Sequence, residues 1–139
     1  MHEKIGGISA ILPAYNEAPC IAELIRSLDA QLRGLGVPYE IIVVDDGSSD
    51  GTGDLAQAAD ARVHRHAANR GYGAAVKTGV RLARQEWILL MDADGSYPAE
   101  AVPDLVSYLE VADMVVGART KPGAKIPRFR QPMKWLLGK

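Results

Sequence analysis

Two aspartates, Asp92 and Asp94, stand one residue apart, directly after the apolar run WILLM at residues 87–91. A short, continuous apolar run of this kind is typical of a strand buried on both faces of a parallel sheet. The two carboxylates would then lie at the carboxyl end of the strand, the edge where open parallel sheets bind ligands. Carboxylates at such an edge can share a hard divalent cation that also holds a phosphate-bearing substrate.

Two simpler interpretations of the Asp-x-Asp-Gly string compete with a metal site. A calcium loop of the helix-loop-helix type needs Gly at its sixth position and Glu at its twelfth. Counted from Asp92, those positions hold Tyr97 and Pro103, so the string does not fit a calcium loop. A plain polar turn, kept open by Gly95 and Pro98, is not excluded by this stretch alone, and the rest of the chain has to decide.

The 139-residue chain has the length and composition of one ordinary globular domain. No apolar run approaches the roughly 20 residues that a membrane-spanning helix needs, and residues 1–7 lack the apolar core of a signal peptide. The single cysteine, Cys20, excludes an internal disulfide and fits a reducing compartment. We expect Cys20 to pack at a helix start, because no basic neighbour in the sequence would activate its thiol.

The net charge of −1 conceals a strong asymmetry along the chain. Residues 119–139 carry seven Lys or Arg and no acid, so residues 1–118 carry nine basic and 17 acidic side chains, a net charge of −8. An acidic body with a basic tail predicts that the tail meets something anionic, although basic tails also serve solubility alone.

Strand-like and helix-like segments alternate along the chain. Short apolar strands are expected at residues 8–12, 39–44, 62–66, 87–91 and 114–117. Helices, indicated by apolar spacing or by a capping residue such as Asp50, are expected at residues 18–33, 52–59, 72–84 and 99–110. This alternation predicts an α/β fold with a mainly parallel sheet and helices on both faces.

The last 20 residues differ in composition from the rest of the chain. Residues 120–139 are rich in Pro, Gly and basic residues with interspersed apolar ones, which predicts either disorder or a surface amphipath. The segment ends on MKWLLGK, a helix-like pattern. We therefore expect a domain at residues 1–119 and a basic amphipathic tail at residues 120–139.

Two further loops that follow expected strands carry polar or aromatic residues. In the first, PAYNE at residues 13–17, Pro13 and Tyr15 could form a wall for a flat base. In the second, DDGSSDGT at residues 45–52, Asp46 could accept from a base N–H or a ribose hydroxyl. Counted from Asp46, that string also resembles a calcium loop, but its twelfth position is Gln57 and a strand precedes it.

A third loop, NRGYGAAVK at residues 69–77, contains Gly71 and Gly73 at an expected helix start. These glycines permit close approach to a phosphate, or tight packing of helix on sheet, and the sequence leaves both open. As a dinucleotide fingerprint the string is weak, because Val76 stands in place of the third glycine and the string follows the third strand rather than the first. His64 and His66 alternate along a strand, and we expect structural roles for them rather than metal binding.

Five motifs in order resemble the nucleotide-binding half of family 2 glycosyltransferases, which have the GT-A fold. They are PAYNE, VVDDGSSDGT, NRGYGAAVKTG, MDADG and VVGAR, and they extend over residues 8–119. The resemblance is strongest to the branch that includes dolichyl-phosphate mannose synthases and bacterial polyprenyl-phosphate sugar transferases. Catalytic domains of the family are longer, so a partner subunit or a missing C-terminal segment is also expected.

The resemblance implies roles for individual residues. The nucleoside would be surrounded by Pro13, Tyr15, Glu17, Val44 and Asp46. The diphosphate would be held through Mg²⁺ or Mn²⁺ by Asp92, Ala93 and Asp94, with Asp94 preferred as direct ligand and as catalytic residue. Ser96 stands where the family often has Gln as a further metal ligand, and its hydroxyl reaches less far.

The resemblance also implies an acceptor phosphate facing Arg119, the second expected catalytic residue, with a partner among Arg128, Arg130 and Lys134. Inverting transfer to a hydroxyl needs a base, and the chain has no acid after Asp113. A phosphate acceptor is already an anion and requires only positioning by Arg. We therefore expect metal-dependent, inverting transfer of a sugar from a GDP- or UDP-sugar to a polyprenyl or dolichyl phosphate.

The basic tail and Trp135 suit an anionic membrane surface, which places the expected protein at the cytoplasmic, inner face of a membrane as a peripheral protein. No nucleic-acid partner is expected. Two alternatives stay open. One is a transferase to a saccharide hydroxyl that uses a base from a missing segment, and the other is a nucleotide-sugar-binding module that does no chemistry itself.

Overall fold

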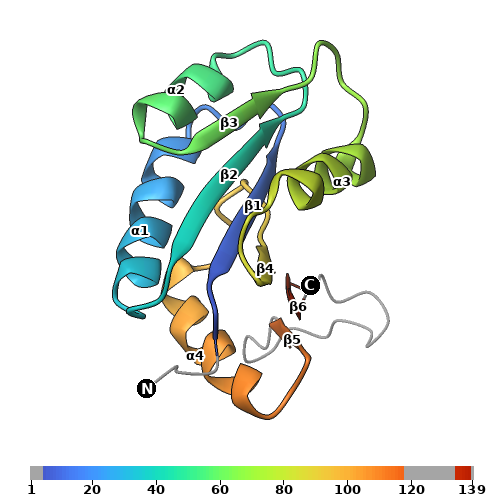
Figure 1. The fold of residues 1–139 in the computed structure, drawn as a ribbon. Helices are drawn as coiled ribbons and strands as arrows, with labels where there is room; N and C mark the ends of the chain where they lie inside the picture. Colours follow the sequence, from blue (N-terminus) through green and yellow to red (C-terminus); the bar gives the residue numbers. More distant parts are fainter. Residues whose placement is uncertain (1–4, 118–133, 139) are drawn as a thin grey trace, which may run out of the picture.

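The apolar segments of the sequence form one sheet in the computed structural model, which describes residues 5–117 and 134–138 (Figure 1). The strand order is β3-β2-β1-β4-β6-β5. Neighbours among β1 to β4 pair in parallel, whereas β6 is antiparallel to both β4 and β5. The strands are β1 (Ile8–Ala14), β2 (Tyr39–Asp45), β3 (Arg62–Arg65), β4 (Trp87–Leu90), β5 (Met114–Gly117) and β6 (Lys134–Gly138).

Helices cover both faces of the sheet (Figure 1). One face packs against α1 (Ile21–Arg33), α2 (Thr52–Ala58) and α4 (Val102–Ser107), and the other packs against α3 (Tyr72–Leu82). Successive side chains of a strand point to opposite faces, so Ala10 and Leu12 of β1 join the first core and Ile11 joins the second. The predicted α/β fold with a mainly parallel sheet is confirmed.

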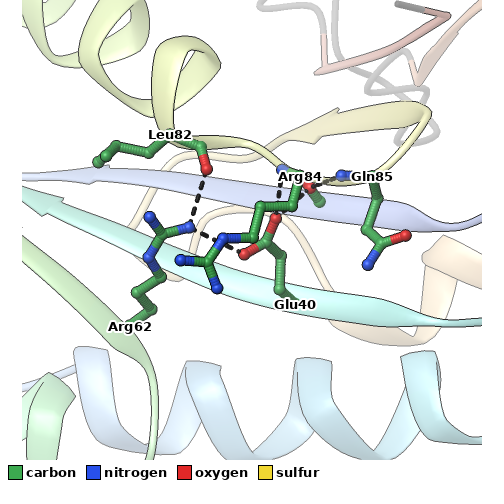
Figure 2. Close-up of polar contacts among 6 residues, drawn as sticks. Glu40, Arg62, Leu82, Arg84 and Gln85 are labelled. Carbon is green, nitrogen blue, oxygen red and sulfur yellow. Dashed lines mark hydrogen bonds and ion pairs between the residues drawn. The ribbon is translucent and has the colours of Figure 1, made fainter.

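The carboxylate of Glu40, which is partly buried, holds together the amino-terminal ends of the parallel strands, as Figure 2 shows. Its carboxylate accepts from the Ser9 hydroxyl at 2.6 Å, from the Arg84 N–H at 2.6 Å and from the Arg62 guanidinium at 3.2 Å. Burial acts to raise the pKa of Glu40, but these bonds and the charge of Arg62 outweigh it and lower the pKa below its ordinary value. The network joins β1, β2, β3 and the segment before β4.

Two expectations about secondary structure were wrong in detail. Within the C-terminal MKWLLGK, the described residues Lys134–Gly138 are not helical but form β6 between β4 and β5. A segment of seven residues has too few positions for its apolar period to separate helix from strand, and here tertiary pairing decides. The helix expected at residues 99–110 is divided into Ala99–Ala101 and Tyr108–Glu110, both 3-10 turns, with α4 between them.

Candidate active site

Two adjoining clefts lie at the carboxyl-terminal edge of the parallel strands. The acidic cleft, about 430 Å³, is lined by Pro13, Tyr15, Glu17, Tyr72, Asp92, Ala93 and Asp94. The Asp46 cleft, about 310 Å³, is lined by Pro13, Ala14, Tyr15, Asp46, Asn69, Gly71, Tyr72 and Ala75. Pro13, Tyr15 and Tyr72 line both, so the two clefts share one wall. The structure therefore brings residues of four separate motifs together.

The loop after β1 is braced against the loop after β2. The Asn16 N–H donates to the Ser48 hydroxyl at 2.9 Å, and the Asn16 side-chain oxygen accepts from the Ser49 N–H at 2.9 Å. The Glu17 N–H donates to the Thr52 hydroxyl at 2.9 Å. Asn16 has a left-handed backbone with φ 52°, which asparagine tolerates better than most residues. The polar DDGSSDGT string thus positions the PAYNE loop.

Glu17 lies in an electrostatic environment that disfavours its negative charge. Burial raises the pKa of Glu17, and the charges of Asp94 and then Asp50 raise it further. Mutual repulsion among carboxylates is relieved when a cation enters between them. The field at the acidic cleft therefore favours a cation or a cation-bearing ligand.

Asp46 is buried and already holds several protein groups. Its Oδ1 lies 2.7 Å from the His66 Nδ1 and accepts from the Arg70 N–H at 2.9 Å, while its Oδ2 accepts from the Gly71 N–H at 2.9 Å. Burial acts to raise the pKa of Asp46, but the bonds from His66, Arg70 and Gly71 outweigh it and lower the pKa. A carboxylate has about four lone-pair sites, so one is left for a ligand.

Tyr72 is a site residue that the sequence analysis missed. It is 56% exposed, begins α3 and donates its hydroxyl to Asp92 Oδ1 at 3.2 Å. Burial of the hydroxyl end, the charge of Asp92 and the hydrogen bond to Asp92 raise the pKa of Tyr72 to about 12. The only signal in the sequence was an aromatic residue between the two glycines of GYG.

The loop after β4 turns sharply around Asp94. The Ser96 N–H donates to Asp94 Oδ1 at 2.9 Å, and Gly95 has a left-handed backbone with φ 73°. Asp94 and Ser96 are exposed, whereas Ala93 is buried at 2% exposure. Ser96 does not line either cleft. Val44 also lines neither, because its side chain is fully buried in the core beneath α3.

The structure describes little of the region where the acceptor phosphate is expected. Arg119, Arg128 and Arg130 lie outside the described residues. The backbone of Lys134 begins β6 and pairs with Gly117 of β5. Among the helices of residues 5–117, none is long and apolar enough to cross a membrane.

Asp92 and Asp94 are suited to one kind of metal ion. The described residues contain no group of three or more His, Cys, Asp or Glu side chains that could hold a metal by itself. Mg²⁺ and Mn²⁺ prefer oxygen ligands, and Mg²⁺ is usually bound by one or two carboxylates together with waters and substrate phosphates. The pair at an open cleft therefore fits a divalent ion that binds with a diphosphate, and it does not fit a closed structural metal site.

The same fold is found in glycosyltransferases of the GT-A class. One solved structure, the mannosyltransferase PcManGT from Pyrobaculum calidifontis in complex with GDP-Man and Mn²⁺, superposes with a TM-score of 0.69 and 26% identity. The match covers 83% of this chain and 35% of that one. The sheet order, the helices on both faces and this similarity define the protein as a GT-A fold.

The sequence profile of Glycosyl transferase family 2 matches residues 9–138, so the chain belongs to that family. The undecaprenyl-phosphate 4-deoxy-4-formamido-L-arabinose transferase of Yersinia enterocolitica is 40% identical over 121 residues, 83% of this chain and 37% of that protein. The dolichol-phosphate mannosyltransferase of Pyrococcus furiosus is 36% identical over 127 residues, 88% of this chain and 36% of that protein. The resemblance seen in the motifs is confirmed, and the chain spans little more than a third of these relatives.

Proposed function

We propose that this chain forms the donor site of a transferase that moves a sugar from a nucleoside diphosphate to a polyprenyl phosphate. The observation that carries the proposal is the acidic cleft, where Asp92 and Asp94 share one space with Pro13, Tyr15 and Glu17. Two acids and a rigid aromatic wall suit the two ends of a nucleoside diphosphate. The similar mannosyltransferase that holds GDP-Man and Mn²⁺ supports the same choice of ligand.

The base and the ribose would occupy the wall that the two clefts share. Pro13 and Tyr15 would contact the flat base, and the lone-pair site left on Asp46 would accept from the nucleoside. Val44 would contribute through its backbone, because its side chain is fully buried. Glu17 would line the part of the site that holds the ligand, and its raised pKa reflects burial and the neighbouring acids, so a cation or hydrogen-bond donor of the ligand would stabilise its charge.

Asp94 and Asp92 would hold Mg²⁺ or Mn²⁺ together with the diphosphate. Ala93, which lies between them, would contribute through its backbone. When bound, the metal ion offsets the negative charge that grows on the leaving β-phosphate. Asp94 is the exposed member of the pair and is held by the Ser96 N–H, so the turn presents it toward the ligand. Ser96 would add its hydroxyl only if the turn moved it into the cleft, and it is the weakest of the assigned ligands.

The acceptor would be an anionic phosphate on a polyprenyl or dolichyl chain. Such a phosphate attacks without a protein base, with inversion at the sugar carbon, and cationic side chains position it. Arg119, with Arg128, Arg130 or Lys134, would supply those cations. The Yersinia and Pyrococcus relatives are named for this class of acceptor, which supports the choice. The basic residues 119–139 would keep the protein peripherally at the inner face of the membrane.

A non-catalytic nucleotide-sugar-binding module is the second candidate function. It would use the same site, because the acidic cleft and the Asp46 cleft would hold a nucleotide-sugar with or without transfer. Transfer of sugar to a polyprenyl phosphate by the 139-residue chain alone would exclude it. Transfer to a saccharide hydroxyl would instead require a base beyond Asp113, supplied by another segment or subunit.

Isothermal calorimetry of the chain with GDP and with UDP tests the donor site. Each nucleotide is titrated first with Mn²⁺ and then with EDTA, and GMP and UMP serve as controls that lack the second phosphate. We expect one diphosphate to bind with Mn²⁺ and to lose most of its affinity in EDTA. Equal binding of the mono- and diphosphate, or no effect of EDTA, would contradict the proposal.

A further inference from the structure

Tyr72 stands where the two clefts meet. Its ring lines both clefts, and its hydroxyl donates to Asp92 Oδ1 at 3.2 Å. Tyr15, which is 47% exposed, also lines both clefts. Tyr72 is the one residue of the described part that lines the Asp46 cleft and is also shown to bond a carboxylate of the acidic cleft.

The backbone that carries Tyr72 is held from inside the protein. Asp46 accepts from the N–H groups of Arg70 and Gly71, directly before Tyr72. Gly71 has φ 99° and ψ 162°, a conformation that strongly favours glycine. His66 bonds to Asp46 and, through Nε2, to Thr78 of α3 at 2.9 Å. The start of α3 is therefore tied to buried groups at two points along its first turns.

From this juxtaposition we propose that Tyr72 is a positioning residue that orients Asp92 for a divalent cation. The same residue would couple the Asp46 cleft, where the nucleoside is expected, to the carboxylates of the acidic cleft. The inference rests on the proposed donor-site function. The Tyr72 hydroxyl holds one oxygen of Asp92, which restricts rotation of the carboxylate where it lines the acidic cleft. A carboxylate oriented in advance loses less entropy when the ligand binds.

The position of the ring gives Tyr72 a second, separable contribution. Because the ring lines both clefts, a base lying against Tyr15 would also meet Tyr72. Loss of the hydroxyl alone should then weaken the metal-dependent part of nucleotide binding, and loss of the ring should weaken the metal-independent part as well. If Tyr72 served only the fold, its two substitutions would not differ in their effects on metal-dependent and metal-independent nucleotide binding.

Calorimetry on Tyr72→Phe and Tyr72→Leu separates the two contributions. The diphosphate that the parent chain prefers is titrated with Mn²⁺ and with EDTA. For Tyr72→Phe we expect unchanged affinity in EDTA and a roughly three- to tenfold loss of affinity with Mn²⁺, the size of one hydrogen bond. For Tyr72→Leu we expect an additional loss in EDTA of about fivefold or more, from the missing stacking surface. Tyr108→Phe, at a similarly exposed tyrosine of 58%, is the matched control and should match the parent.

The outcomes distinguish this inference from the donor-site proposal. If the parent binds with Mn²⁺ and Tyr72→Phe binds equally well, only the role of Tyr72 is overturned. If Tyr72→Phe loses affinity to the same extent in EDTA and in Mn²⁺, the hydroxyl acts on the fold rather than on the metal-dependent step, and the inference is again overturned. If the parent binds no nucleotide under either condition, both the inference and the proposed function fail.

Discussion

At the scale of single residues, Asp46 has a structural role in addition to its proposed role in ligand binding. The sequence indicated that it could accept from a nucleoside, and that role stays a proposal. The structure adds that its two oxygens already accept from His66, Arg70 and Gly71, which follow it by 20 to 25 residues. No local pattern could predict these partners, because they depend on how the loop after β3 returns to the sheet.

Replacing Asp46 with Asn should destabilise the fold at neutral pH. The amide would place N–H groups against N–H donors, so we expect a loss of about 1–3 kcal/mol in the free energy of unfolding. The pKa of Asp46 is lowered in the folded protein, so its stabilisation is present above the unfolded pKa of about 4 and is lost as the pH falls through the lower, folded pKa. Urea unfolding of parent and variant from pH 7 to pH 3 measures this difference.

The control for this experiment is Asp104→Asn on α4, an exposed aspartate for which the same curves should coincide with the parent's within about 0.5 kcal/mol. A difference between the parent and Asp46→Asn that grows toward acid pH would contradict the assigned direction of the pKa shift.

Tyr72 and His66 were the harder residues to assign from sequence. His66 was expected to be structural, and its buried bonds to Asp46 and Thr78 agree with that expectation. Tyr72 was not singled out, because its contact with Asp92 joins two motifs 20 residues apart that only the sheet brings together. The sequence did single out Asp92 and Asp94, because they directly follow an expected strand, and their role as metal ligands stays a prediction.

At the scale of elements, the glycines in and just before α3 differ in how closely they pack against the sheet. The sequence left Gly71 and Gly73 undecided between ligand approach and close packing on the sheet. In the structure a Cβ on Gly73 would meet nothing within 4 Å, whereas a Cβ on Gly79 would come within 2.4 Å of Ile11 Cγ2 on β1. The closely packed glycine is therefore Gly79, a residue that no turn signal marked.

Gly79→Ala and Gly73→Ala should change stability in opposite directions. Ile11 is fully buried and has no room to move, so the methyl group at residue 79 should cost about 1–3 kcal/mol. The methyl group at residue 73 is exposed and should stabilise α3 by roughly 0.5–1 kcal/mol, because alanine favours helix over glycine. Chemical denaturation of both variants tests the pair, and equal effects would contradict the packing of α3 on β1.

Most strands and helices were predictable because their apolar periods extend over whole elements, as in α1 with its buried Ile21, Leu24, Ile25, Leu28 and Leu32. The strand β6 was not predictable in this way. Its conformation follows from pairing with two other segments, β4 and β5, which its own residue pattern does not reveal.

At the scale of the whole molecule, the amino-terminal and carboxyl-terminal ends of the parallel strands have different roles. The amino-terminal edge is closed by the Glu40 network, and the carboxyl-terminal edge carries the two clefts. A parallel sheet brings its loops together at one edge, so the alternation of strand and helix predicted where the site would lie. The strand order, with β6 inserted, was beyond the reach of the sequence alone.

The charge asymmetry of the whole chain predicts binding to anionic membranes. Arg128 and Arg130 lie outside the described residues, and their replacement by Gln removes two cations from the basic tail. At about 1 kcal/mol per basic residue near an anionic surface, affinity should fall roughly 30-fold. Co-sedimentation with phosphatidylglycerol vesicles measures this, and the control variant is Arg26→Gln with Arg81→Gln, two exposed arginines of α1 and α3. If both variants and the parent sediment equally with the vesicles, the prediction that the basic tail binds anionic membranes is contradicted.

The central claim is that Asp92 and Asp94 hold a divalent ion together with the diphosphate of a nucleotide-sugar. The most direct measurement is calorimetric titration of Asp94→Asn with the preferred nucleoside diphosphate in Mn²⁺, beside the exposed control Asp113→Asn. Hydrogen bonds to charged groups contribute about 1.5–3 kcal/mol each, and a direct metal ligand should contribute no less. The account predicts that Asp94→Asn binds with the same weak affinity in Mn²⁺ as in EDTA, whereas Asp113→Asn keeps the metal dependence of the parent. Unchanged Mn²⁺-dependent affinity in Asp94→Asn would contradict it.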